Sequence, residues 1–280
     1  MQVRVITPHS GLAGFSNALT SLLSAFRPAR QLAWRFFLRD TRADHRQSLL
    51  GYAWLVMIPL ANTLVWVFLN DQNVIQIETG SVPYPVFVLA GTVLWTAFNS
   101  SLMAMLSVID SACGMLAKVN FPHEALPYAA FLKSSVDAVI ASLLLVPALF
   151  IFDVSPQPSM LLFPVALLAS LLLGCGLGLI ALPLAALYPD IGRVVQLALR
   201  FGFFLTPVIF PLPAAGIARR IMLINPVTPI IVSGRAWLTG SGEAMPTAFT
   251  ATVLICVALI ATALVFYKIS VPHLIERLGG

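Results

Sequence analysis

Six apolar segments, each close to the length that crosses a bilayer, divide this chain of 280 residues. A helix needs about 20 consecutive apolar residues to span the hydrocarbon core of a membrane. Only 10% of the residues are charged, whereas a water-soluble domain usually carries about a quarter. The sequence therefore predicts an all-α polytopic membrane protein with six transmembrane helices, at approximately 49–70, 85–110, 129–152, 160–188, 191–210 and 247–267.

The basic residues predict the orientation of these helices. Seven of the sixteen precede residue 48, and six spans place both termini on one side. With cytoplasmic termini, only Arg219, Arg220 and Arg235 lie outside, as the positive-inside rule requires. This clustering indicates topology and not nucleic-acid binding. We expect a cytoplasmic N-terminal segment over 1–48, one transmembrane domain over 49–270 and a cytoplasmic tail over 271–280.

The region 211–246 departs from the pattern of full-length spans. Its two apolar pieces, 214–224 and 227–238, are each too short to cross and are separated by Asn225-Pro226. Proline ends helices because it lacks a backbone donor and clashes with the preceding turn. Irregular backbone at membrane depth survives only where protein buries it or where it lines a watery cavity. We expect two short re-entrant helices on the outer side, before the last span.

An arginine stripe precedes the first span. Its members recur at helical spacing, so that one helix face carries all four, and Trp34, Phe36 and Phe37 are interleaved with them. Such an amphipathic interface helix would present guanidinium groups to lipid phosphates. The alternative is a simple topology anchor. The four residues are Arg35, Arg39, Arg42 and Arg46.

Charge is scarce within the predicted spans. No acidic relay of the kind that proton- or sodium-driven transporters use is visible, so another subunit is expected to supply the energy. Arg200 lies about ten residues into the fifth span, either as a contact for an anionic substrate or as a packed residue capped by carbonyls. No phosphate loop, nucleophile elbow or metal-ligand spacing indicates catalysis or a cofactor in this chain.

Aromatic residues are candidates for lining a conduit for sugars. Their rings let the apolar faces of sugars slide, although an interfacial aromatic belt explains the same residues and is the more common arrangement. With Arg200, the channel candidates are Tyr52, Trp54, Trp95 and Phe98.

Several segments resemble the permease subunits of ABC exporters of polysaccharides and polyol phosphates. Together they extend over about 35–240, in the family's order. His45 and His123 depart from it, standing where tyrosine and arginine are common. The segments are 37–40 with 48–54 and Pro59, 83–87 with Gly91, Trp95 and Phe98, 118–127, Pro189-Asp190, 206–211, Asn225-Pro226 and Arg235.

That resemblance implies a function. The chain would be half of a homodimeric pore in the bacterial inner membrane, docked on two copies of a separate ATPase that binds ATP and Mg²⁺. Hydrolysis would export a lipid-linked glycan, such as O-antigen or capsular polysaccharide. A coupling loop over about 113–128 would contact the ATPase through Lys118, Phe121, Pro122, His123 and Glu124. The outer gate would contain Pro207, Phe210, Asn225, Pro226 and Arg235.

Three other functions fit parts of the sequence. A permease for drugs or small lipids would share the topology. An integral-membrane glycan-processing enzyme would need gathered acidic residues, whereas Asp71, Glu78, Asp153 and Glu243 are scattered over the outer loops. A structural or assembly factor would need neither re-entrant helices nor an arginine at mid-membrane depth.

Overall fold

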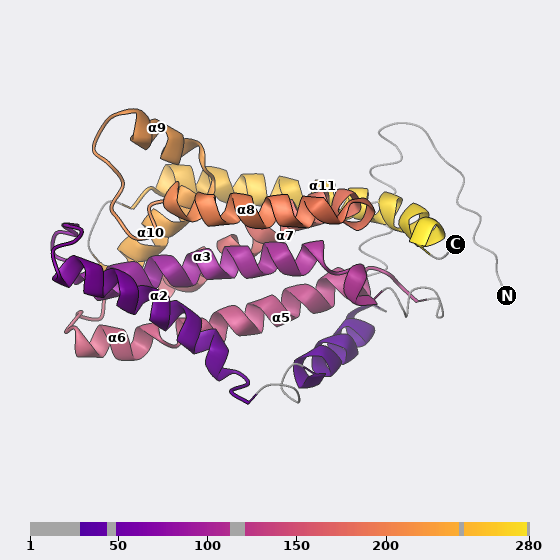
Figure 1. Ribbon diagram of the computed structural model, residues 1–280, viewed down its shortest axis with the longest axis horizontal. Helices are drawn as coiled ribbons and strands as arrows, with labels where there is room; N and C mark the ends of the chain where they lie inside the picture. Colours follow the sequence, from indigo (N-terminus) through magenta and orange to yellow (C-terminus); the bar gives the residue numbers. More distant parts are fainter. Residues whose placement is uncertain (1–28, 44–48, 113–120, 241–243, 279–280) are drawn as a thin grey trace.

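A computed structural model of the chain describes residues 29–43, 49–112, 121–240 and 244–278, and these form an elongated helical bundle (Figure 1). No β-strand occurs in the described ranges. The helices are 29–43, α2 (Ala53–Asp71), α3 (Tyr84–Leu106), η1 (Asp110–Ala112), α5 (Ala125–Ser142), α6 (Leu145–Ile151), η2 (Pro158–Leu162), α7 (Phe163–Leu187), α8 (Pro189–Phe204), α9 (Ile217–Ile224), α10 (Val227–Thr239) and α11 (Pro246–Leu278).

Five of the six predicted spans are confirmed as helical segments long and apolar enough to cross a membrane. Two of them combine consecutive elements, α5 with α6 and η2 with α7. The protein is therefore a multi-pass membrane protein. Within the described residues these segments are Ala53–Asp71, Tyr84–Leu106, Ala125–Ile151, Pro158–Leu187 and Pro246–Leu274.

The predicted span at 191–210 is not one continuous helix. Its helical part, α8, has 16 residues and ends at Phe204, which gives a length of about 24 Å, short of the roughly 30 Å core. Pro207 explains the end of the helix, because the residue before a proline is pushed out of the helical conformation. The apolar residues that follow belong to a non-helical segment, buried at 206–209.

Two short helices stand where the sequence predicts them before the last span. α9 and α10 meet at Asn225-Pro226 with an angle of 94° between their axes. The Asn225 side chain stabilises the bend, since its Oδ1 accepts a hydrogen bond of 3.0 Å from the backbone N–H of Val227. α10 is mostly buried against α3 and α7, whereas α9 is mostly exposed.

The core of the bundle is the pair α3 and α7. Gly174 and Gly178 of α7 lie directly against α3, where a Cβ added to Gly178 would come within 2.5 Å of the Leu102 carbonyl oxygen. The Ser101 hydroxyl of α3 donates a 2.9 Å hydrogen bond to the Leu171 carbonyl of α7. Small residues permit such backbone approach between membrane helices. α2 and α8, in contrast, expose most of their apolar side chains.

We expect Gly174→Ala to lower the thermal stability of the detergent-solubilised protein. The new Cβ would overlap the Ser101 hydroxyl and the Phe98 carbonyl, so that α3 and α7 must separate, at a cost of about 1–3 kcal/mol. Gly192→Ala on α8 is the control, because a Cβ there meets no atom within 4 Å. Unfolding would be followed by size-exclusion chromatography after heating. A Gly174→Ala protein as stable as the parent would contradict this packing.

Candidate functional site

Two groups of predicted site residues lie at opposite ends of the bundle. We call the end that carries helix 29–43, residues 121–124 and the later turns of α11 the basal end (Figure 1). The distal end, at the opposite side of the same view, carries α9, α10 and the end of α2. The predicted coupling residues that the structure describes, 121–124, lie at the basal end and the predicted gate residues at the distal end.

An aromatic contact joins the coupling segment to helix 29–43. The Phe121 ring packs edge-on against Phe36, with 5.6 Å between ring centroids, and lies 5.4 Å from the His123 ring. All four residues from Phe121 to Glu124 are partly buried. Lys118, which was predicted with them, lies outside the described residues. Movement of the segment 121–124 would therefore reach helix 29–43 through ring packing.

α11 holds the same segment from the other side. The Tyr267 hydroxyl donates a 3.0 Å hydrogen bond to the His123 carbonyl, and Lys268 Nζ lies 3.9 Å from Glu124 Oε1. Burial lowers the pKa of the His123 imidazole, and the nearby Glu124 carboxylate opposes that shift. His123 therefore favours its neutral form, whereas the arginine that the family resemblance leads one to expect at this position would be a cation. We call Phe36, Phe121, His123, Glu124, Tyr267 and Lys268 the basal cluster.

The arginine stripe lies on the exposed face of helix 29–43. Arg35, Arg39 and Arg42 are exposed there, while Ala33 and Phe36 are buried. Arg46 lies outside the described residues. A cavity of about 700 Å³ opens between this helix and α5, lined by Arg30, Gln31, Trp34, Arg35, Tyr128 and Leu132. Two guanidinium groups beside aromatic and aliphatic side chains suit an anionic amphiphile.

Of the five channel candidates, only Trp95 and Phe98 are in ring contact with each other, with 5.4 Å between centroids. Trp95 and Phe98 are buried, and Trp95 packs against Phe203 of α8 with 6.0 Å between centroids. Tyr52 and Trp54 are exposed near the start of α2, and Arg200 is exposed on α8. A role in lining a conduit stays a prediction for all five.

The predicted gate residues are largely connected to one another at the distal end. Asn225 Nδ2 donates a 2.7 Å hydrogen bond to the Thr206 hydroxyl. The buried Arg235 donates to the carbonyls of Pro207, at 2.6 Å, and Val208, at 3.5 Å. These bonds fasten α9 and α10 to the segment after α8. Phe210 lies partly buried at the end of that segment, and Pro226 forms the bend.

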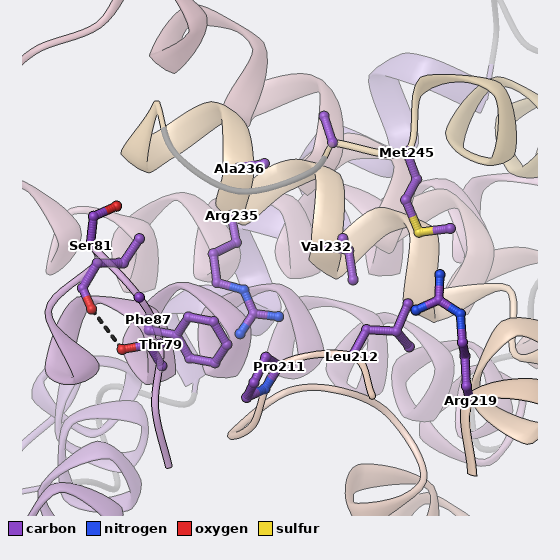
Figure 2. A pocket seen from close by; sticks show the side chains of 13 residues that line it. Thr79, Ser81, Phe87, Pro211, Leu212, Arg219, Val232, Arg235, Ala236 and Met245 are labelled. Carbon is purple, nitrogen blue, oxygen red and sulfur yellow. Dashed lines mark hydrogen bonds between the residues drawn. The ribbon is translucent and has the colours of Figure 1, made fainter. Parts of the chain in front are cut away.

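Arg235 also borders a pocket of about 380 Å³, which we call the distal pocket (Figure 2). Its guanidinium carbon lies 3.5 Å from the centroid of the Phe87 ring, a cation–π contact. Sequence reasoning missed Arg219, Thr79 and Ser81, which also line this pocket. One signal in the sequence could have indicated Arg219. It is predicted to lie on the outer side, where the positive-inside rule makes cations rare.

α11 contacts both ends of the bundle. Near its start, Phe249 packs edge-on against Trp237 of α10, with 4.7 Å between ring centroids. Near its other end, Tyr267 reaches the basal cluster. Within the ranges that the structure describes, no group of three His, Cys, Asp or Glu side chains could hold a metal ion.

Comparisons with known proteins give a consistent result. The family model for the ABC-2 type transporter matches residues 30–238. The O-antigen export system permease protein RfbA of Myxococcus xanthus is 29% identical over 202 residues, covering 71% of this chain and 76% of that protein. Its Klebsiella pneumoniae counterpart is 23% identical over 173 residues, covering 61% and 66%. The polysialic acid transport protein KpsM of Escherichia coli is 22% identical over 193 residues, covering 68% and 73%.

We expect Arg235→Ala to destabilise the protein by about 1–3 kcal/mol, because it leaves the buried carbonyls of Pro207 and Val208 without their donor. Arg220→Ala removes an exposed guanidinium from the neighbouring α9 and should leave stability unchanged. Thermal unfolding in detergent measures both. Equal unfolding temperatures for the two variants would show that the Arg235 bonds do not hold the distal end.

Proposed function

The chain belongs to the ABC-2 type transporter family, and on this premise we propose that it is the membrane-spanning permease subunit of an ABC transporter that exports a lipid-linked polysaccharide. The observation that carries the proposal is the agreement among relatives. Proteins similar to this chain over most of its length are named for O-antigen export and for polysialic acid transport. Both names denote the movement of a polysaccharide. The substrate class comes from those names and not from a feature of the bundle.

The proposed orientation places the basal end in the cytoplasm of a bacterial cell. Arg35, Arg39 and Arg42 lie at that end, together with Lys268, and the positive-inside rule then assigns both termini to the cytoplasm of the inner membrane. Helix 29–43 is the amphipathic interface helix in this arrangement. α9 and α10, bent by 94°, are the re-entrant pair on the periplasmic side.

The proposed transporter contains two copies of this chain and two copies of an ATPase subunit, which binds ATP and Mg²⁺. The exposed apolar side chains of α2 and α8 support a second copy or lipid as their partner. Trp66 of α2 and Phe204 of α8 are in edge-on contact, with 6.2 Å between centroids, so the two exposed helices meet on one side of the bundle. A dimer formed through that side would enclose the channel between protomers.

The basal cluster is the proposed contact with the ATPase. The residues 121–124 touch helix 29–43 through Phe121 and α11 through the His123 carbonyl. A displacement imposed on this short segment by the ATPase would move both helices. The arginine stripe, beside the cavity next to α5, is the proposed contact for the phosphates of the lipid carrier.

The experiment that tests this function combines deletion and purification. Deleting the gene should abolish the surface polysaccharide of the cell and leave its lipid-linked precursor inside. The tagged chain should co-purify with an ATP-binding subunit, and the chain freed of that subunit should hydrolyse no ATP. Hydrolysis by highly purified chain alone, or normal surface polysaccharide in the deletion strain, would reject the proposal.

We expect Phe121→Ala to uncouple transport from hydrolysis, because it removes the ring that packs against Phe36. Export should fall at least several-fold, while membrane insertion stays normal. Phe150→Ala is the matched control, since this ring is 76% exposed on α6 at the distal end. Surface polysaccharide and ATPase co-purification measure the effect. Unchanged export and unchanged association in Phe121→Ala would exclude the basal cluster as the coupling site.

We expect a combined Arg-to-Lys exchange at Arg35, Arg39 and Arg42 to preserve topology but impair export. Lysine keeps the charge that the positive-inside rule counts, whereas it cannot form the planar bidentate contacts that guanidinium makes with phosphate. Reporter fusions verify the topology, and surface polysaccharide measures export. Full export with lysines would assign the stripe to anchoring alone.

A further inference from the structure

The distal pocket is lined by cationic and hydroxyl groups. Arg235 comes from α10, Arg219 from α9, and Thr79 and Ser81 from the segment before α3 (Figure 2). No acidic residue is among the described residues that line it. The segment before α3 and the distant pair α9 and α10 thus converge on one cavity that two arginines line.

Among the residues that the structure describes, Arg235 has no acidic partner in this pocket. Only 5% of its surface is exposed, and its described polar partners are the two neutral carbonyls of Pro207 and Val208. The face of the Phe87 ring attracts the guanidinium through the ring quadrupole, but the ring carries no net negative charge. A buried cation is normally paired with an anion, because burial removes most of the stabilisation that water gives it. The guanidinium has five N–H donors, so the two carbonyl bonds leave others free to meet a ligand.

Arg219 supplies a second cation that is held in place. Its Nη1 donates a 2.7 Å hydrogen bond to the Pro213 carbonyl, so the side chain is oriented before any ligand arrives. On the side of the pocket opposite Arg219, the backbone turns at Gly80, between Thr79 and Ser81. Gly80 has the left-handed conformation, with φ of 66°. The Thr79 hydroxyl bonds the Val82 carbonyl at 2.7 Å, which fixes that turn. Both walls are therefore ordered by bonds within the protein.

We propose that the distal pocket binds an oxyanion, a carboxylate or phosphate carried on a small polar molecule, between Arg235 and Arg219. Its volume of about 380 Å³ is near the lower end of the range for small-molecule sites. An acidic sugar unit and a glycerophosphate headgroup both present this chemistry. The proposal does not depend on the proposed export function, because binding is measured on the isolated protein.

The experiment measures binding to the purified full chain in detergent by isothermal titration calorimetry. The probes are glucuronate, glycerol phosphate and glucose, of which glucose is the neutral match for glucuronate. We expect saturable binding of at least one anionic probe and none of glucose. Stronger binding of glucuronate indicates that the oxyanion belongs to an acidic sugar. Stronger binding of glycerol phosphate indicates that it belongs to a lipid headgroup.

Arg219→Gln tests the site without removing the structural bonds of Arg235. Glutamine keeps a polar side chain of similar stem, but the positive charge is lost, and we expect binding to weaken about tenfold. Arg220→Gln is the matched control, because the adjacent arginine is exposed and does not line the pocket. Binding should be unchanged in that variant. Equal binding of glucose and glucuronate, binding of no anionic probe to the folded protein, or an equal loss in both variants would overturn the proposal.

Discussion

The close approach of α3 and α7 is the interaction on which the rest of this bundle depends. Apolar side chains gain little by leaving lipid for one another, so membrane helices are held together by tight packing and hydrogen bonds. Gly174 and Gly178 bring the α7 backbone onto α3, and Gly91 brings α3 onto the Val208 backbone in the same way. Gly234 of α10 likewise allows close contact with Leu94 of α3 and Ala166 of α7. These close contacts join α3, α7 and α10 into one packed frame.

The basal cluster and the distal pocket lie at the two ends of this frame. The basal cluster attaches to it through α11, and the distal pocket opens where α10 meets the start of α3. α2 and α8 lie outside the frame, with apolar faces that the protomer leaves uncovered. A fixed centre with exposed flanking helices suits a family whose members assemble with further subunits, because assembly can occur without disturbing the packed core.

Much of the fold follows from the sequence, because span length and proline placement are local properties. Five spans and the bend at Asn225-Pro226 lie where the sequence predicts them. The prediction of a continuous helical span at 191–210 was wrong. α8 ends at Phe204, shortly before Pro207, although the residues around this proline are apolar. Sequence reasoning connected Arg235 with Asn225 and Pro226 only through family resemblance. It could not connect Tyr267 with His123, or place Arg219 and Thr79 in one pocket, because the residues of each pair are more than a hundred positions apart.

The span of α11 between Phe249 and Tyr267 contains neither glycine nor proline, and covers about 27 Å at 1.5 Å per residue. Its ends are the ring contact with Trp237 and the hydrogen bond to the His123 carbonyl. A helix without a flexible joint has low compliance, so it transmits a push along its axis and absorbs little of it. One glycine or proline introduced in the middle of this segment would supply such a joint and would let each end move without the other.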